Sequence, residues 1–501
     1  MIAAGRVPRK GDPENSMPTV PRGKISQKAN YAGDFGVVLR SSALFYYRSK
    51  KASFSTTYSF MNYWKRKRGL HVAIIASLRD MSGRLVRREE LKFSEGEVLN
   101  YRPCGKEEDF EGSVEIEIFS TQNLVIPYAA IMAIYETFQG VSIVHSYGRV
   151  YSTHEIEEGR TITQGEEACW TLRDDAETHS FGVFHNGHHR CESQVVDLRV
   201  QNAAGELKCA KIALTALLPY QTVKIVPAEY IPDLVGWLGG RPGYASLSFR
   251  VMDSFTRMLL ANERNDGSDF QATHSNFNYS KHETDCVEVA NQKAYMLVLP
   301  LPGIERGVAV YPDCHPGTYT VRFNGESVKH SAGRATWIPL PQEKLTLEFG
   351  KESGSLPSRI VTGLVTHKGP DCIPNECSLG VEHHQRPCKR NSWGLASARP
   401  DLKGTLYLHE ISAVYGGIAD DTKISFKLFS AQSHGYLETI REGKDVPSFE
   451  KGVPFAELWP NAEEYLGGDF GYFTVVSEYG GLLCYSSLEN DSGSFTMEHA
   501  F

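Results

Sequence analysis

Three histidines of this chain recur in one setting and could carry chemistry. His145, His274 and His499 each end a short strand-like run of largely apolar residues. An imidazole in that place can satisfy a loop carbonyl while it covers apolar surface, which is a purely structural role. The alternative is a metal or anion site in which the three histidines surround a shared pseudo-threefold axis. That alternative requires the segments that carry them to close into a ring.

A pattern of Tyr, His and Glu follows the first two of these histidines. Its copies are Tyr151-Ser-Thr-His154-Glu155 and Tyr279-Ser-Lys-His282-Glu283. In one interpretation these side chains tie consecutive domains together through hydrogen bonds. In the other, each His-Glu pair lines a cleft at a domain junction, where it could bind a ligand, transfer protons or ligate a metal.

Two denser groups of histidines could hold a metal of the Zn or Fe type, since neutral imidazoles are common ligands of both. The groups are His185, His188 and His189 in one stretch, and His383 with His384 in another. The matching run Asn62-Tyr-Trp-Lys65 has no good metal ligand, which favours polar and aromatic surface contact instead. The second group lies among cysteines whose intervals differ from those of structural zinc sites. The sequence therefore leaves open whether the protein holds Zn, Fe or no cofactor, and no cofactor is the simplest expectation.

The elements that must position these residues are strands. Val114-Glu-Ile-Glu-Ile-Phe119 alternates apolar and polar residues, as do Gln194–Val200 and Lys423–Phe429. A period of two places one face of a strand in a core and the other toward solvent. Many such runs separated by Gly, Asn and Asp indicate an all-β protein of antiparallel β-sandwiches.

The chain also repeats its landmarks in one order: a turn glycine, a serine and a final histidine. The triplets are Gly83, Ser120 and His145, then Gly205, Ser254 and His274, then Gly435, Ser477 and His499. Three strand-like runs that share an initial serine, at Ser59, Ser180 and Ser378, suggest where each repeat begins.

These landmarks predict three tandem sandwich modules and one further β segment. The predicted ranges are a disordered, Pro-rich basic arm at 1–36, module 1 at 37–157, module 2 at 158–286, an intervening β subdomain or insertion at 287–370, and module 3 at 371–501. Asn324-Gly325 in the intervening segment is a hairpin-turn signal.

Composition narrows the function class. The 501 residues are 41% hydrophobic and 23% charged, with a net charge of -7, which argues against general affinity for nucleic acid. No stretch has the length and hydrophobicity of a signal peptide or a membrane span. Ten scattered cysteines without a C-x-x-C pair fit a cytoplasmic protein. Glycine-rich nucleotide loops and the H-E-x-x-H and G-x-S-x-G motifs are missing from the sequence.

The tandem sandwiches, with aromatic and polar strand faces, resemble carbohydrate-binding modules in fold and composition only. The leading hypothesis is accordingly a non-catalytic, multi-module binding or assembly protein, with a saccharide or other small ligand at its module junctions. A metal-dependent enzyme that uses the histidine-rich edges of modules 2 and 3 is the first alternative. A structural subunit of a larger oligomer is the second.

Overall fold

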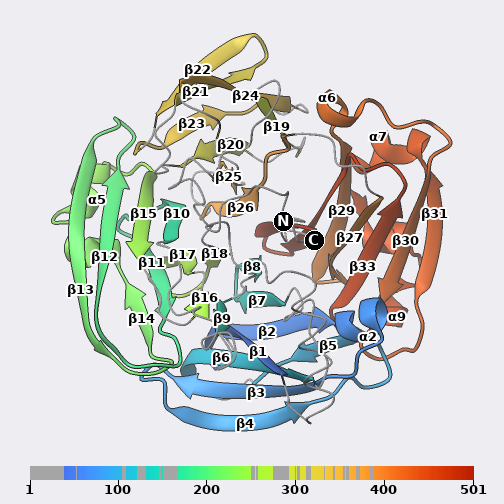
Figure 1. Ribbon diagram of the computed structural model, residues 1–501, viewed down its shortest axis with the longest axis horizontal. Helices are drawn as coiled ribbons and strands as arrows, with labels where there is room; N and C mark the ends of the chain where they lie inside the picture. The colour runs from blue at the N-terminus through green and yellow to red at the C-terminus, as the bar shows by residue number, and fades with distance from the viewer. Residues whose placement is uncertain are drawn as a thin grey trace, which may run out of the picture.

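The computed structural model contains eight antiparallel sheets that pack in pairs (Figure 1). It describes residues 39–51, 53–103, 109–120, 131–145, 148–150, 166–249, 254–255, 258–274, 293–298, 301, 305–311, 318–331, 333–341, 345–353, 356, 360–367, 373–383 and 389–500. The predicted all-β class is confirmed. The predicted disordered arm lies outside the described residues.

Sandwich 1 pairs a sheet of order β1-β6-β3-β4 with a sheet of order β5-β2-β7-β8. Two short strands, β9 and β16, extend the first of these sheets beyond β1. The elements are β1 (Leu39–Ser49), β2 (Phe54–Met61), α2 (Tyr63–Arg68), β3 (Ala73–Asp80), β4 (Leu85–Leu91), β5 (Val98–Tyr101), β6 (Phe110–Ser120), β7 (Met132–Thr137), β8 (Val141–His145) and β9 (Gly148–Val150).

Sandwich 2 repeats this arrangement, with sheets of order β10-β15-β12-β13 and β14-β11-β17-β18. Its short helices lie at the outer rim of the molecule (Figure 1). The elements are β10 (Glu166–Leu172), β11 (Thr178–His185), β12 (Cys191–Gln201), β13 (Leu207–Leu217), β14 (Thr222–Ile225), α4 (Pro227–Tyr230), α5 (Leu234–Leu238), β15 (Gly243–Phe249), β16 (Ser254–Phe255), β17 (Leu259–Arg264) and β18 (Phe270–His274).

Sandwich 3 is built from the segment predicted as an insertion, and it has the same strand order as sandwiches 1 and 2. Its sheets are β19-β24-β21-β22 and β23-β20-β25-β26. The elements are β19 (Lys293–Val298), β20 (Glu305–Val310), β21 (Thr318–Phe323), β22 (Glu326–Ser331), β23 (Thr336–Pro339), β24 (Leu345–Ser353), β25 (Thr362–His367) and β26 (Asn375–Leu379).

Sandwich 4 completes the set, with sheets of order β27-β33-β30-β31 and β28-β29-β34-β35; β32 also pairs with β29. Its elements are β27 (Arg390–Ala396), β28 (Ala398–Arg399), β29 (Leu402–Glu410), α6 (Ser412–Tyr415), β30 (Lys423–Phe429), β31 (Leu437–Glu442), η2 (Gly443–Asp445), α7 (Val446–Phe449), β32 (Val453–Pro454), α8 (Phe455–Leu458), α9 (Ala462–Leu466), β33 (Gly471–Ser477), β34 (Leu482–Asn490) and β35 (Phe495–His499).

The predicted boundary at residues 370 and 371 needs correction. It separates β26 from its own sheet, because β26 pairs with β25 from Thr362↔Leu379 to Thr366↔Asn375. The next sandwich starts only at β27. The run that begins at Ser378 spans the end of a last strand, whereas those that begin at Ser59 and Ser180 lie in second strands, so the three runs do not mark equivalent starts.

The turn glycines mark one equivalent hairpin in every sandwich: β3–β4, β12–β13, β21–β22 and β30–β31. Gly83, Gly205 and Gly435 have φ of 86°, 82° and 80°, the left-handed region that favours glycine. Gly325 has φ of 80° in the same hairpin of sandwich 3, after Asn324 with φ of 45°. Two consecutive positive φ values are those of the type I′ turn that Asn-Gly predicts.

The alternation of apolar and polar residues correctly predicts the core face of the strands. The prediction that the polar face of β6 is exposed to solvent is wrong. On β6, Ile116 and Ile118 are buried in the core of sandwich 1. The glutamates between these apolar residues are also buried, although the pattern predicts a solvent face. Glu115 pairs with Arg79 at 3.1 Å and Glu117 with Arg88 at 3.0 Å, which offsets part of the cost of burying their charge.

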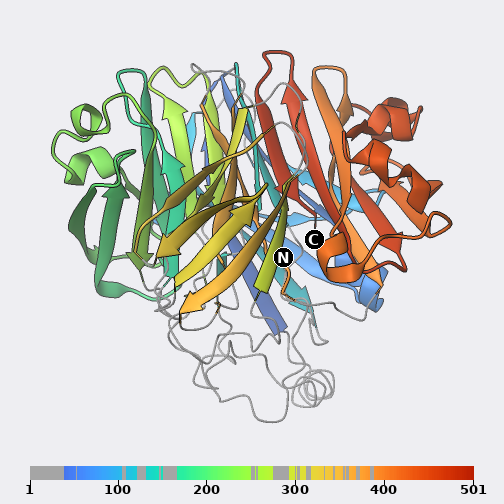
Figure 2. The ribbon, with the colours of Figure 1, turned by 90° about the horizontal axis from the view of Figure 1, so that it is seen from above.

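The four sandwiches stand side by side around one axis in chain order (Figures 1 and 2). Their cores are not separate. One hydrophobic cluster joins sandwiches 4, 1 and 2, another joins sandwiches 3 and 4, and a smaller one joins sandwiches 2 and 3. The last strand of each sandwich lies at the centre, so the architecture brings four equivalent strands together.

Candidate functional site on the ring axis

The centre of the molecule is a ring of four last strands. β8 contacts β18 and β35, and β26 contacts the same two strands from the opposite side. The pseudo-symmetry is therefore fourfold, and the threefold arrangement considered from the sequence is wrong. Each of these strands is the edge strand of its sheet and faces the axis. The backbone groups on its outer edge therefore need partners from a neighbouring sandwich.

Side chains supply partners for the exposed edge of β8. Three of its N–H groups donate to alternate residues of the loop and strand of β35: Val141 N to Ser494 Oγ (3.0 Å), Ile143 N to Thr496 Oγ1 (3.1 Å) and His145 N to Glu498 Oε2 (3.5 Å). Likewise, Ala272 N of β18 donates to Ser142 Oγ of β8 at 2.9 Å. Short polar side chains thus take the place of a pairing strand.

Asn375 performs the same function for sandwich 3. Its Oδ1 accepts from Met497 N of β35 at 3.3 Å. Its Nδ2 donates to Gln271 Oε1 of β18 at 3.1 Å and to Thr496 Oγ1 of β35 at 3.0 Å. One buried amide therefore links three of the four strands.

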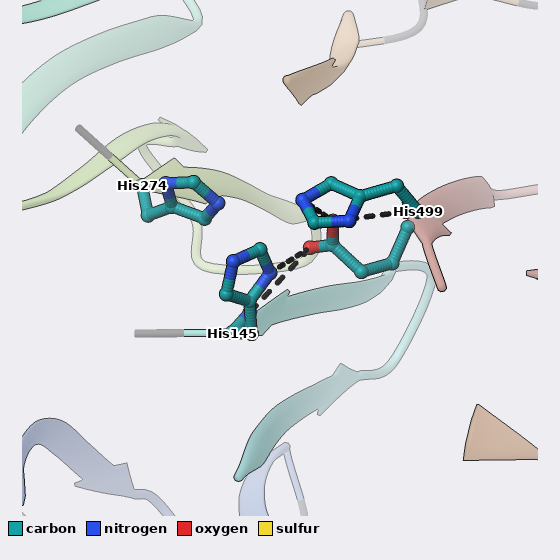
Figure 3. Close-up of side chains that lie close together, drawn as sticks. His145, His274 and His499 are labelled. Carbon is teal, nitrogen blue, oxygen red and sulfur yellow. Dashed lines mark hydrogen bonds and ion pairs between the residues drawn. The ribbon is translucent and has the colours of Figure 1, made fainter. Parts of the chain in front are cut away.

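The axial cluster, defined as His145, His274, His499 and Glu498, lies at one end of this ring. One ligand atom from each of the four residues lies within 4.8 Å of the others. The His145 ring centroid is 4.1 Å from that of His274 and 4.7 Å from that of His499. Figure 3 shows the three imidazoles converging from three different strands.

Hydrogen bonds hold the carboxylate of the axial cluster in place. Glu498 Oε2 lies 3.1 Å from His145 Nδ1, and Oε1 accepts from His499 N at 3.0 Å. Oε1 also lies 3.6 Å from His499 Nε2. The same carboxylate therefore caps backbone groups and contacts two imidazoles.

Burial controls the charge of the axial cluster. His145, His274 and Glu498 are buried, and the His499 side chain is 14% exposed. Burial raises the pKa of Glu498 against the opposing effect of His499. Burial, with repulsion from His145 and His274, lowers the pKa of His499 well below its usual value. The neutral imidazole that results is the form that ligates metals.

The fourth strand departs from the pattern at the position of the histidines. His145 pairs with the first residue of β7, and His274 pairs with the first residue of β17. Leu379 pairs with the first residue of β25 in the same way. Sandwich 3 therefore places a buried leucine where the other three place an imidazole.

The structure locates the other predicted site residues unevenly. Both Tyr-His-Glu patterns lie outside the described residues, as does His384. His185 is buried, with Nδ1 2.9 Å from Thr222 Oγ1, and burial lowers its pKa to about 4. The rings of His188 and His189 contact each other at 4.1 Å. Across the described residues, the axial cluster is the single group of three or more His, Cys, Asp or Glu whose ligand atoms converge this closely.

Sequence reasoning missed Glu498 and Asn375, although it named the three histidines. Glu498 directly precedes a repeated histidine. It is the fourth residue of its last strand, and the corresponding residues of the other last strands are the uncharged Val144, Thr273 and Ser378. Alignment of the four last strands would have shown this difference. That alignment required β26 to be recognised as a last strand.

Comparison with known proteins leaves the geometry as the basis for function. No protein-family model matches this sequence, and no curated protein is significantly similar to it. The helices in the described part of the chain are short, and none has the length and apolar character needed to cross a membrane.

Proposed function

We propose that this protein is a non-catalytic scaffold, in which one chain holds four β-sandwiches in fixed positions around a closed ring. The observation that supports the proposal is the closure itself. All four last strands meet at the axis, and side chains of neighbouring sandwiches cap backbone N–H groups of β8, β18 and β35. Such a ring presents the outer surfaces of the sandwiches in a defined arrangement for ligands or partner proteins.

The shared cores support a rigid scaffold over a chain of independent domains. The cluster that joins sandwiches 4, 1 and 2 includes Trp393, Phe181 and Phe270 beside the core of sandwich 1. Arg48 pairs with Glu263 across the boundary of sandwiches 1 and 2 at 2.6 Å. Because apolar burial crosses the boundaries, unfolding one sandwich exposes surface on its neighbours.

Calorimetry of the full chain tests the scaffold. We expect one main thermal transition whose calorimetric and van't Hoff enthalpies are close, since the sandwiches unfold together. Asn375→Leu removes the amide that links three strands and should lower the transition temperature or split the transition. Asn391→Leu, at an exposed position on β27, is the matched control. Four separate wild-type transitions that Asn375→Leu leaves unchanged would contradict the proposal.

Saccharide binding at a junction is a second candidate, and one observation favours it. Trp337 of sandwich 3 is 39% exposed, and its ring centroid lies 6.4 Å from that of Tyr244 of sandwich 2, at an interplanar angle of 34°. An aromatic face at a junction is a typical platform for an amphipathic ligand. Titration with soluble oligosaccharides should quench tryptophan fluorescence in the wild type and in Trp237→Phe, but not in Trp337→Phe. Equal responses of all three proteins would exclude this site.

A structural subunit would reveal itself by its mass in solution. Light scattering should give the mass of one chain if the scaffold acts alone. A discrete larger mass would favour the assembly form of the same proposal.

A further inference from the structure

We propose that the axial cluster is a binding site for one divalent transition-metal ion, for which Zn²⁺ is the best match, held by His145, His274, His499 and Glu498. This inference goes beyond the scaffold, because hydrogen bonds can close the ring without an ion. It starts from convergence: three imidazoles from three sandwiches and one carboxylate bring their ligand atoms within 4.8 Å of one another at the end of the ring.

The donor types select the class of ion. Three imidazole nitrogens and one carboxylate oxygen suit Zn²⁺ and its transition-metal neighbours, whereas Ca²⁺ and Mg²⁺ prefer sets of oxygen ligands. Zinc–nitrogen bonds of about 2.0 Å in a tetrahedron separate the donors by about 3.3 Å. The ligand atoms, which lie within 4.8 Å of one another, would therefore need to move closer by about 1.5 Å at most to reach coordination distance.

The number of donors also fits. Leu379 holds the position in β26 that the histidines hold in β8, β18 and β35, so the fourth strand adds no fifth ligand. Four protein ligands are the full set of a closed tetrahedral zinc site. The ion would therefore be structural, and it would link sandwiches 1, 2 and 4 directly.

A purely hydrogen-bonded cluster explains less of the arrangement. The contact between His145 and Glu498 needs one imidazole, yet the ring of His274 lies against that of His145 in a buried site, and His499 is adjacent. A single cation at the centre would contact all three rings and the carboxylate of Glu498 at once.

Surrounding contacts would orient the ligands. Glu498 accepts from the backbone N–H of both His145 and His499, which fixes its carboxylate relative to two of the rings. His499 Nδ1 lies 3.4 Å from the carbonyl oxygen of Ala500. Second contacts of this kind direct the ligating atom of a histidine toward a metal.

Metal analysis of the full chain tests the inference. Protein stripped with a chelator and titrated with ZnCl₂ should bind one equivalent, and CoCl₂ should give the visible absorption of a tetrahedral cobalt site. His274→Ala removes a ligand and leaves the Glu498 contacts to His145 and His499 in place, so zinc binding at the axis should weaken by at least about tenfold. His330→Ala is the control, because His330 is buried beside Thr336 in sandwich 3.

Two results would overturn the inference. One is folded wild-type protein that binds less than half an equivalent of zinc. The other is folded His274→Ala that binds zinc as tightly as the wild type. Circular dichroism establishes folding in each case, and Glu498→Gln, which keeps the shape of the side chain, replaces His274→Ala if that variant does not fold. Neither result bears on ring closure, which calorimetry measures separately.

Discussion

Two glutamates on neighbouring last strands show how surroundings decide what a buried carboxylate can do. Glu498 on β35 lies among three imidazoles. Glu376 on β26 is enclosed by Tyr311, whose hydroxyl donates to it at 2.5 Å, and by Thr171, whose N–H donates at 2.8 Å. Burial raises the pKa of both carboxyls. The first has the partners of a cation site, whereas the second is a hydrogen-bonded seam between sandwiches 2 and 3.

Other contacts surround Glu376 at the seam. Sandwiches 2 and 3 share a small apolar cluster that includes Cys169 and Ala309. Further hydrogen bonds join Gln201 to the backbone of Ala335. The carboxylate of Glu376 lies against Gly363, where a Cβ atom would collide with it. We therefore expect that metal binding at the axis and the protonation of Glu376 at the seam each change the free energy of unfolding.

The largest expected effect is stabilisation by zinc. An ion that binds the folded but not the unfolded chain raises the unfolding free energy by about 4 kcal/mol at a free concentration of a thousand times its Kd. Denaturant titration with and without ZnCl₂ should show this gain in the wild type and in Glu376→Gln, and its loss in Glu498→Gln. An equal gain in both variants would show that zinc binds elsewhere.

The second effect is the pH dependence of the seam. Burial raises the pKa of Glu376 to about 7 in the folded protein, against about 4.3 in an unfolded chain. The folded state thus binds the proton more tightly, so stability is full below about pH 4.3 and declines as pH rises to about 7.

The free energy of unfolding falls by about 1.4 kcal/mol for each pH unit in which the unfolded carboxyl is ionised and the folded one is protonated. The total decline up to pH 7 should therefore amount to about 2–3 kcal/mol. Unfolding free energies measured across this pH range should show the decline in the wild type, and the decline should be absent in Glu376→Gln. Glu348→Gln, which removes a partner of Lys293 and Arg322 on β24 of sandwich 3, should retain this pH dependence. A wild-type stability that rises by this amount from pH 5 to pH 7 would reverse the assignment.

A smaller loss should follow when an edge cap of the ring is removed. Thr496→Val keeps the shape of the side chain but removes the oxygen that accepts from Ile143 N and Asn375 Nδ2. Leaving buried donors unsatisfied should cost about 1–2 kcal/mol in urea unfolding. Thr439→Val, on the outer strand β31, should stay within about 0.5 kcal/mol of the wild type. Equal stabilities for the two variants would show that the caps contribute nothing.

The smallest change in stability is expected from the Tyr-His-Glu patterns. The double variant His154→Ala with His282→Ala should weaken ligand binding at the junctions. Its melting temperature should stay within about 1 °C of the wild type, because the sequence predicts surface positions for both histidines and substitutions there cost little. A drop of several degrees with unchanged ligand binding would make these residues structural links, and the axis and the seam would remain as the sites of interest.

Part of the fold could be predicted from local pattern. Alternation identified β6, β12 and β30 as strands, and Asn324-Gly325 identified a hairpin turn. These features depend on neighbouring residues only. Sandwich 3 was not recognised as a repeat because its last strand ends in Leu379, so the histidine landmark is missing there although the strand order is the same.

The sequence by itself determined the all-β class, the shared turn glycines and the three histidines that end last strands. Only the tertiary structure decided that four sandwiches close into a ring and that Glu498 joins the histidines. The physical reason is the separation in sequence between the residues that interact. Strand alternation and turns reflect contacts between residues close in sequence, whereas His145, His274 and His499 are more than a hundred residues apart and meet only in the closed ring, where neighbouring sandwiches cap their strand edges.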